Sequence, residues 1–138
     1  MKIYIFFALF FIWGCQSNET EQKSKDSEIV NFANEKLTTL ELKNTVVDVG
    51  SISDDTTVFA DYYLQNTGSE DLHIYSVAPD CYCTGYKLSK KVVSSGDTAK
   101  IVLEFNSKNK YGKQKIYSTV TVNTKDKLYR LILKANIK

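Results

Sequence analysis

Two cysteines separated by one residue, Cys81 and Cys83, form the most chemically distinctive pair in the sequence. In an extended strand their side chains would project from the same face about 6.6 Å apart, whereas the Cβ atoms of a disulfide lie roughly 3.5 to 4.5 Å apart. A bond between them therefore requires a bend, which the flanking Pro79 and Gly85 favour. Three states are open: two reduced, partly buried thiols, a tight disulfide, or a soft-metal site that uses both thiolates.

His73 is the only histidine and could supply a third metal ligand. The simpler interpretation is an exposed strand histidine with no further role, because the alternation of the sequence places it on the polar face. A lysine-rich stretch further along is either a patch for phosphate or anionic lipid or a solvated hairpin between two strands. Its cations are Lys108, Lys110, Lys113 and Lys115.

A complete catalytic constellation is missing from the sequence. There is no second histidine, no glycine-rich loop of the kind that cradles phosphate and no full set of metal ligands, so we expect neither enzyme activity nor a cofactor. The 18 basic and 16 acidic residues leave a net charge of only +2. That balance provides no field for a nucleic-acid partner.

The N-terminus has the pattern of an export signal. It begins MKIYIFFALFFIWGC, in which one lysine precedes an unbroken apolar run over residues 3–13. As a helix this run would rise about 16 Å, which is too short to cross a bilayer core of about 30 Å. We therefore assign residues 1–14 to a cleaved signal peptide.

Residues 12–15 resemble the bacterial lipobox, in which the cysteine is acylated and becomes the mature N-terminus. The resemblance implies a lipidated Cys15 and a cell-envelope protein anchored to the membrane by its acyl chains. The alternative is that Cys15 merely lies near an ordinary secretory cleavage site. Gln16 carries no retention charge, so we expect the outer membrane.

Residues 15–38 are predicted to hold the lipidated cysteine and a flexible tether. Within them, residues 16–28 lack aliphatic and aromatic side chains and cannot offset the entropy of ordering. Residues 29–37 have a spacing compatible with one or two weak helical turns. With Cys15 carrying lipid, an exported protein keeps an even cysteine pair, and export makes its oxidation feasible.

From residue 39 onward, apolar and polar residues alternate with the period of two that half-buried strands require. Turn signals recur about every ten residues, and no helical crossovers separate the strands. We therefore predict one all-β domain over residues 39–138, an immunoglobulin-like antiparallel β-sandwich of seven to eight strands. The predicted strands are 39–42, 45–49, 58–65, 71–77, 84–88, 99–105, 115–123 and 129–137.

Two of these strands flank a strong turn signal, Asn-Thr-Gly at residues 66–68. We therefore expect residues 58–65 and 71–77 to pair as a hairpin. The side chains predicted to face the core are Val58, Ala60, Tyr62 and Leu64 on the first strand and Leu72 and Ile74 on the second.

A series of short motifs carries a family resemblance. They are VDVGSI at 47–52, YYLQNTG at 62–68, LHI at 72–74, CYCT at 81–84 and SGD at 95–97. Their order resembles the bacterial domain-of-unknown-function family 1573 over roughly residues 40 to 138. The resemblance implies an immunoglobulin-like sandwich of the kind seen in pilus-chaperone and major-sperm-protein domains, which often follows a lipoprotein signal and has no assigned biochemical activity.

These features together predict a membrane-tethered, non-catalytic envelope lipoprotein. We expect it to serve as a binding or assembly module for an envelope protein, through an exposed sheet edge or loop end. The alternative is an envelope protein that handles metal or thiols through Cys81 and Cys83.

Overall fold

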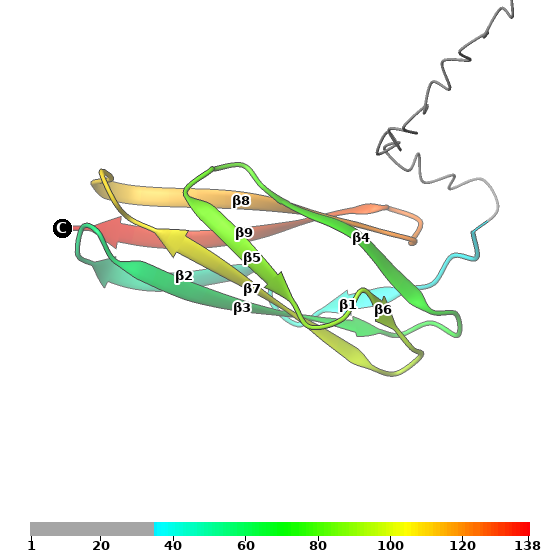
Figure 1. Ribbon diagram of the computed structural model, residues 1–138. Coiled ribbons are helices and arrows are strands. Elements are labelled where there is room, and N and C mark those ends of the chain that lie inside the picture. Colours follow the sequence, from blue (N-terminus) through cyan, green and yellow to red (C-terminus); the bar gives the residue numbers. More distant parts are fainter. Residues whose placement is uncertain (1–34) are drawn as a thin grey trace, which may run out of the picture. The chain divides into compact units, whose positions relative to one another are not determined.

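The computed structural model describes residues 35–138, so the predicted signal peptide, Cys15 and the tether up to residue 34 lie outside the described residues. Within this range the chain forms nine strands in two sheets packed face to face (Figure 1). No helix in this range is long and apolar enough to span a membrane. The strands are β1 (Leu40–Leu42), β2 (Val46–Ile52), β3 (Thr57–Asn66), β4 (Leu72–Pro79), β5 (Thr84–Leu88), β6 (Val92–Val93), β7 (Thr98–Asn106), β8 (Gly112–Val122) and β9 (Leu128–Ile137).

The four-stranded sheet has the order β1-β3-β7-β5, and the five-stranded sheet has the order β2-β9-β8-β4-β6. Strand pairing is antiparallel except between β2 and β9, which run parallel. This pair departs from the predicted antiparallel sandwich. Most of the domain separates β2 from β9 in sequence, so no tight turn forces them to run in opposite directions.

The predicted hairpin between residues 58–65 and 71–77 is wrong. β3 pairs with β1 and β7, whereas β4 pairs with β6 and β8 in the other sheet. The Asn-Thr-Gly segment therefore carries the chain from one sheet to the other. Alternation could not reveal this, because two strands that face each other across a core bury alternate residues just as two paired strands do.

The core between the sheets contains the residues that the alternation predicted, with Ala60, Tyr62 and Leu64 almost entirely buried. In β4 an irregularity between Ile74 and Ser76 shifts the alternation by one residue and keeps the later Val77 inside. The sequence pattern did not reveal β6, because two residues are too few to show a period.

Asn66 joins the two sheets where the chain crosses between them. Its side chain is fully buried at the end of β3. Its Nδ2 donates to the carbonyl oxygens of Glu70 and Val93, each at 2.8 Å. Its Oδ1 accepts from Thr38 Oγ1 at 2.9 Å and from the Gly68 amide at 3.1 Å. The amide is therefore fully satisfied, and Val93 belongs to the opposite sheet.

Glycine is required at position 68 because the residues just before β1 approach its backbone closely. A Cβ atom at this position would overlap Thr38 Oγ1 and lie 2.7 Å from the Thr39 amide nitrogen. The glycine of the predicted turn signal therefore allows the start of the domain to pack against the crossover.

Tyr62 links the sheets a second time. Its ring is fully buried, and its hydroxyl donates to the carbonyl oxygen of Ile132 in β9 at 2.8 Å. Burial raises the pKa of Tyr62 to about 12, and a hydrogen bond with the backbone of Val47 acts more weakly in the opposite direction. The folded state therefore favours the neutral phenol.

Replacing Asn66 with alanine should lower the free energy of unfolding by about 3 kcal/mol, because the buried backbone groups on both sides of the crossover lose their partners. Urea denaturation measures this change. Gln65→Ala is the matched control, since Gln65 is only half-buried and its side chain makes one long bond, of 3.4 Å, to the Gly96 carbonyl. We expect a change within about 0.5 kcal/mol for the control, and equal losses in the two variants would contradict the role of Asn66.

Tyr62→Phe should flatten the pH dependence of stability in alkaline solution. The folded-state pKa of Tyr62 is about 12, against an ordinary value of about 10 in the unfolded chain. Its contribution to stability is therefore complete below about pH 10 and is lost as the pH rises toward 12. Urea denaturation of both proteins at about pH 8 and pH 11 checks this. Parallel declines in the two proteins would show that the phenol does not titrate in this way.

Candidate functional site

Cys81 and Cys83 form a disulfide within the turn that connects β4 to β5. The backbone bends there, because the Thr84 amide donates to the Cys81 carbonyl oxygen at 3.0 Å. The two cysteine Cα atoms lie 5.1 Å apart, and the Cys83 amide donates to Cys81 Sγ at 3.1 Å. The chain thus has the bend that pairing of these cysteines requires.

The structure separates His73 from the cysteine pair. His73 lies near the start of β4 and Cys81 follows its end, so the strand places them roughly 25 Å apart. The His73 ring stacks with Tyr75 at a centroid distance of 6.4 Å, and its Nδ1 lies 3.8 Å from Glu35 Oε1. His73 therefore cannot complete a metal site with the cysteines. Across residues 35–138 no three His, Cys, Asp or Glu side chains are grouped as metal ligands.

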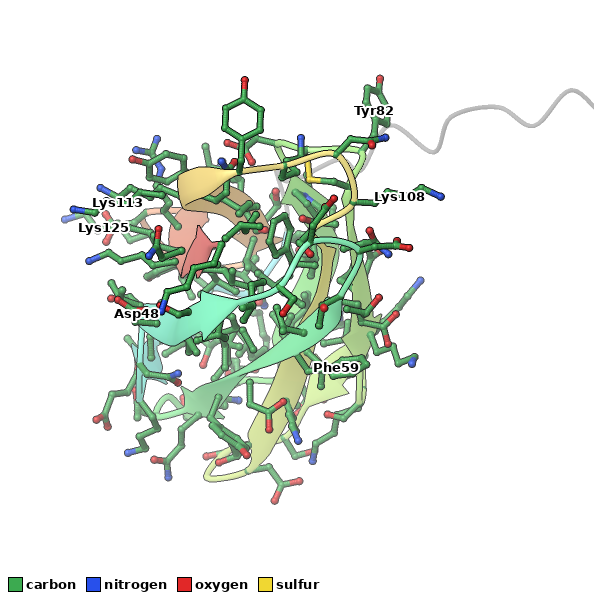
Figure 2. All side chains as sticks on the ribbon, turned by 90° about the vertical axis from the view of Figure 1, so that its left-hand side faces the viewer. Asp48, Phe59, Tyr82, Lys108, Lys113 and Lys125 are labelled. Carbon is green, nitrogen blue, oxygen red and sulfur yellow. A yellow bond between two sulfur atoms is a disulfide. The ribbon has the colours of Figure 1, made fainter. Side chains whose placement is uncertain are left out.

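The disulfide turn presents Tyr82 to solvent. The relative accessibility of Tyr82 is 112%, and its ring points away from the domain (Figure 2). Cys81 and Cys83 are partly buried against the core, so the turn is anchored on both sides of the tyrosine. Tyr82 was not predicted from the sequence as a site residue, because Tyr82 belongs to no alternating run. The signal that could have indicated it is a large aromatic residue in the middle of a loop that is too short to bury its side chain in the core.

Two hollows flank Tyr82. One has a volume of about 500 Å³ and is lined by residues that include Glu104, Asn106 and Lys108. The other has a volume of about 570 Å³ and is lined by residues that include Asp80 and Tyr86. Tyr82 lines both hollows, so a partner could contact the ring from two sides.

Gly85 also lines both hollows. A Cβ atom at this position would meet only Glu104 Oε2, at 3.9 Å. Packing therefore does not require glycine here. The missing side chain instead leaves room beside Tyr82.

The lysine-rich stretch does not form the hairpin that we considered, because β7 and β8 belong to different sheets. Residues 107–111 instead connect the sheets at the end of the domain where Tyr82 lies. Lys108 lines a hollow beside Tyr82, and Tyr111 in this connection is 86% exposed. Aromatic and basic side chains thus share this end.

The carboxylates beside Tyr82 already have partners. Glu104 forms an ion pair with Lys87, and Asp80 Oδ1 accepts a hydrogen bond from the Tyr117 amide at 3.1 Å. Both carboxylates that line the hollows therefore already have a hydrogen-bond or ion-pair partner.

Charge interactions elsewhere do not reach these hollows. The pKa of Lys100 is raised because its ammonium donates to Asp61 at 2.7 Å on the exposed face of the four-stranded sheet. Tyr62, whose pKa is also raised, lies in the core. Neither group faces the Tyr82 turn.

Residues 40–137 match the model of a protein family described as a protein of unknown function, DUF1573. The chain belongs to the DUF1573 family. The match spans the strands of both sheets and confirms the predicted family. No curated protein sequence matches the chain significantly.

The DUF1573 domain is similar to several solved structures. A crystal structure of a protein of unknown function from Porphyromonas gingivalis W83 has a TM-score of 0.65 and 18% identity, covering 73% of this chain and 47% of that one. The ASH/PapD-like domain 7 of human CEP192 has a TM-score of 0.56 and 15% identity, covering 74% and 87%. The E. coli chaperone DraB has a TM-score of 0.52 and 8% identity, covering 74% and 56%.

These likenesses show a PapD-like, immunoglobulin-like sandwich, which confirms the predicted fold class. At such identities they show the fold alone. The chain spans about half the length of the Porphyromonas gingivalis protein.

Replacing both cysteines, as Cys81→Ser/Cys83→Ser, should lower the free energy of unfolding by only about 1.5 kcal/mol, because the disulfide closes a loop of three residues. Exchange of the Thr84 amide hydrogen, which bonds to the Cys81 carbonyl oxygen, should accelerate while exchange in β3 and β7 stays unchanged. Urea denaturation and hydrogen exchange measure the two effects. Reductant should reproduce them in the original protein and change nothing in the variant. Global unfolding of the variant would show that the disulfide stabilises the whole domain and not only the turn.

Proposed function

We propose that this protein is a membrane-tethered, non-catalytic envelope lipoprotein whose DUF1573 domain binds an envelope protein through the Cys81–Cys83 turn. The observation that supports this proposal is the presentation of Tyr82, a fully exposed aromatic ring on a turn closed by a disulfide. The acylated Cys15 predicted from the sequence would attach the protein to the outer membrane.

Preorganisation is the reason why this tyrosine suits binding. Tyrosine combines apolar area with a polar tip, and aromatic residues dominate the binding energy of many interfaces. A residue on a constrained turn loses little conformational freedom when a partner binds. The hollows on both sides of Tyr82 provide space for side chains of the partner.

The described chain begins at the end of the domain opposite the Tyr82 turn, so a tether would not obstruct this turn. Thr38, just before β1, bridges to Thr124 in the turn between β8 and β9. The Tyr82 turn lies beside the connection at the other end of β8. The 11 residues of β8 separate these ends by about 35 Å. A membrane anchor at Cys15 would therefore leave the Tyr82 turn accessible.

Site-specific photo-crosslinking in cells tests the proposal. A photoreactive phenylalanine analogue replaces Tyr82 in one variant and Tyr63 in a matched control. Tyr63 is also an exposed tyrosine, 39% accessible, and lies on β3 opposite Lys100, outside the residues that line the two hollows beside Tyr82. We expect one discrete adduct with an envelope protein from position 82 and none from position 63. The same adducts from both positions, or none from either, would refute the proposal.

Two further results distinguish the alternatives. Gly85→Val in the position 82 variant adds bulk to both hollows and should abolish the adduct while the protein stays folded. A thiol-handling protein would instead yield, without light, a reducible mixed disulfide through Cys81 or Cys83. That product, together with loss of the light-dependent adduct, would favour the alternative function.

A further inference from the structure

The outer faces of the two sheets differ in whether their charged side chains form ion pairs. On the four-stranded sheet, the ion pairs are Glu41 with Lys43, Asp61 with Lys100, and Glu104 with Lys87. On the five-stranded sheet, β8 and β9 carry four cations that form no ion pair with any residue of the range 35–138. They are Lys113, Lys115, Arg130 and Lys134. We call these four residues the basic face.

The basic face places like charges at neighbouring positions of paired strands. Lys115 and Lys134 are directly opposite each other on paired antiparallel strands. Like charges in this arrangement are destabilising. Tyr117 lies between two cations, with Lys115 Nζ and the Arg130 guanidinium carbon each 5.4 Å from its ring centroid. The fold thus concentrates positive charge where an external anion would relieve the repulsion.

The carboxylates that border the basic face bond to the backbone. Asp48 Oδ1 accepts from the Gly50 amide at 2.9 Å, within the irregularity of β2. Asp80 Oδ1 accepts from the Tyr117 amide. A hollow of about 480 Å³ at the β2 irregularity is lined by Lys113, Lys115, Lys134 and Asp48 among others. Lysines therefore outnumber carboxylates in the lining of this hollow, three to one.

Apolar side chains accompany the cations. Leu128 at the start of β9 is 60% exposed, and Val46, the partner of Ile132 in the parallel pair, is 43% exposed. Figure 2 shows Lys113, together with Lys125 from the turn after β8, projecting to one side of the domain, away from Tyr82 and Phe59. Cations mixed with tyrosine and aliphatic side chains on an exposed face are typical of surfaces that lie on membranes.

We propose that the basic face docks the domain onto a bilayer surface rich in anionic lipid. This inference rests on the proposed membrane tether, because attachment near the N-terminus would hold the face at high local concentration next to the bilayer. Docking by this face leaves the Tyr82 ring accessible, since Tyr82 and Lys113 project in different directions (Figure 2).

Lysine labelling on vesicles tests the proposal. The full chain, purified with its native N-terminus, is mixed with vesicles of phosphatidylcholine alone or with about one third phosphatidylglycerol, and an amine-reactive acetylating reagent is added. Mass spectrometry then reports the rate at each lysine. We expect acetylation of Lys113, Lys115 and Lys134 to slow by about threefold or more on the anionic vesicles, with recovery in about 0.5 M NaCl. Rates at Lys43, Lys87 and Lys100 on the opposite sheet should not change.

A matched pair of variants removes two charges from either sheet. Arg130→Gln/Lys134→Gln should abolish the protection of Lys113 and Lys115, whereas Lys87→Gln/Lys100→Gln should leave it intact. Equal rates on both kinds of vesicle, or equal protection of lysines on both sheets, would overturn the proposal. Protection that appears in native envelopes and not on pure lipid would also overturn it, because the occupant would then be an acidic protein.

Flotation of the same mixtures separates this inference from the proposed function. Flotation with both kinds of vesicle but without site-specific protection refutes docking by the basic face and leaves the tether intact. Flotation with anionic vesicles alone, with protection, supports the basic face and refutes the tether. Failure to float with either refutes both.

Discussion

The buried side-chain amide of Asn66 is the interaction on which the arrangement of the strands depends. It lies where the chain leaves the four-stranded sheet, and it binds the backbone of β6 in the five-stranded sheet. A buried amide is costly unless each donor and acceptor has a partner, so its four hydrogen bonds favour one position of the crossover. The crossover sends β4 to the opposite sheet from β3.

The position of β4 determines where the candidate site lies. β4 belongs to the five-stranded sheet and β5 to the four-stranded sheet, so the short Cys81–Cys83 turn spans the two sheets at one end of the sandwich. The two cysteines pack against the core and hold this turn in place, so the Tyr82 side chain is exposed to solvent. The same division into sheets separates the paired charges on one outer face from the basic face on the other.

Period-two alternation predicted the fold class, nearly all the strands and the buried side of β3, because burial between two layers imposes that period. It could not predict which strands pair. The hairpin between residues 58–65 and 71–77 and the lysine-rich hairpin were wrong, and the parallel pairing of β2 with β9 was not foreseen, because strand pairing depends on contacts distant in sequence. Asn66 was predicted only as a turn residue, since its burial depends on Val93. The net charge of +2 concealed the basic face, because a sum over the sequence does not show that Glu41, Asp61 and Glu104 pair with lysines on the opposite sheet.

We propose that an exported, lipid-anchored domain presents Tyr82 on an oxidised turn. Intact-mass and peptide mass spectrometry of the protein from native membranes tests it most directly. We expect a mature N-terminus at an acylated Cys15 and a disulfide between Cys81 and Cys83. An intact leader with an unmodified Cys15, or two free thiols in the exported protein, would contradict it.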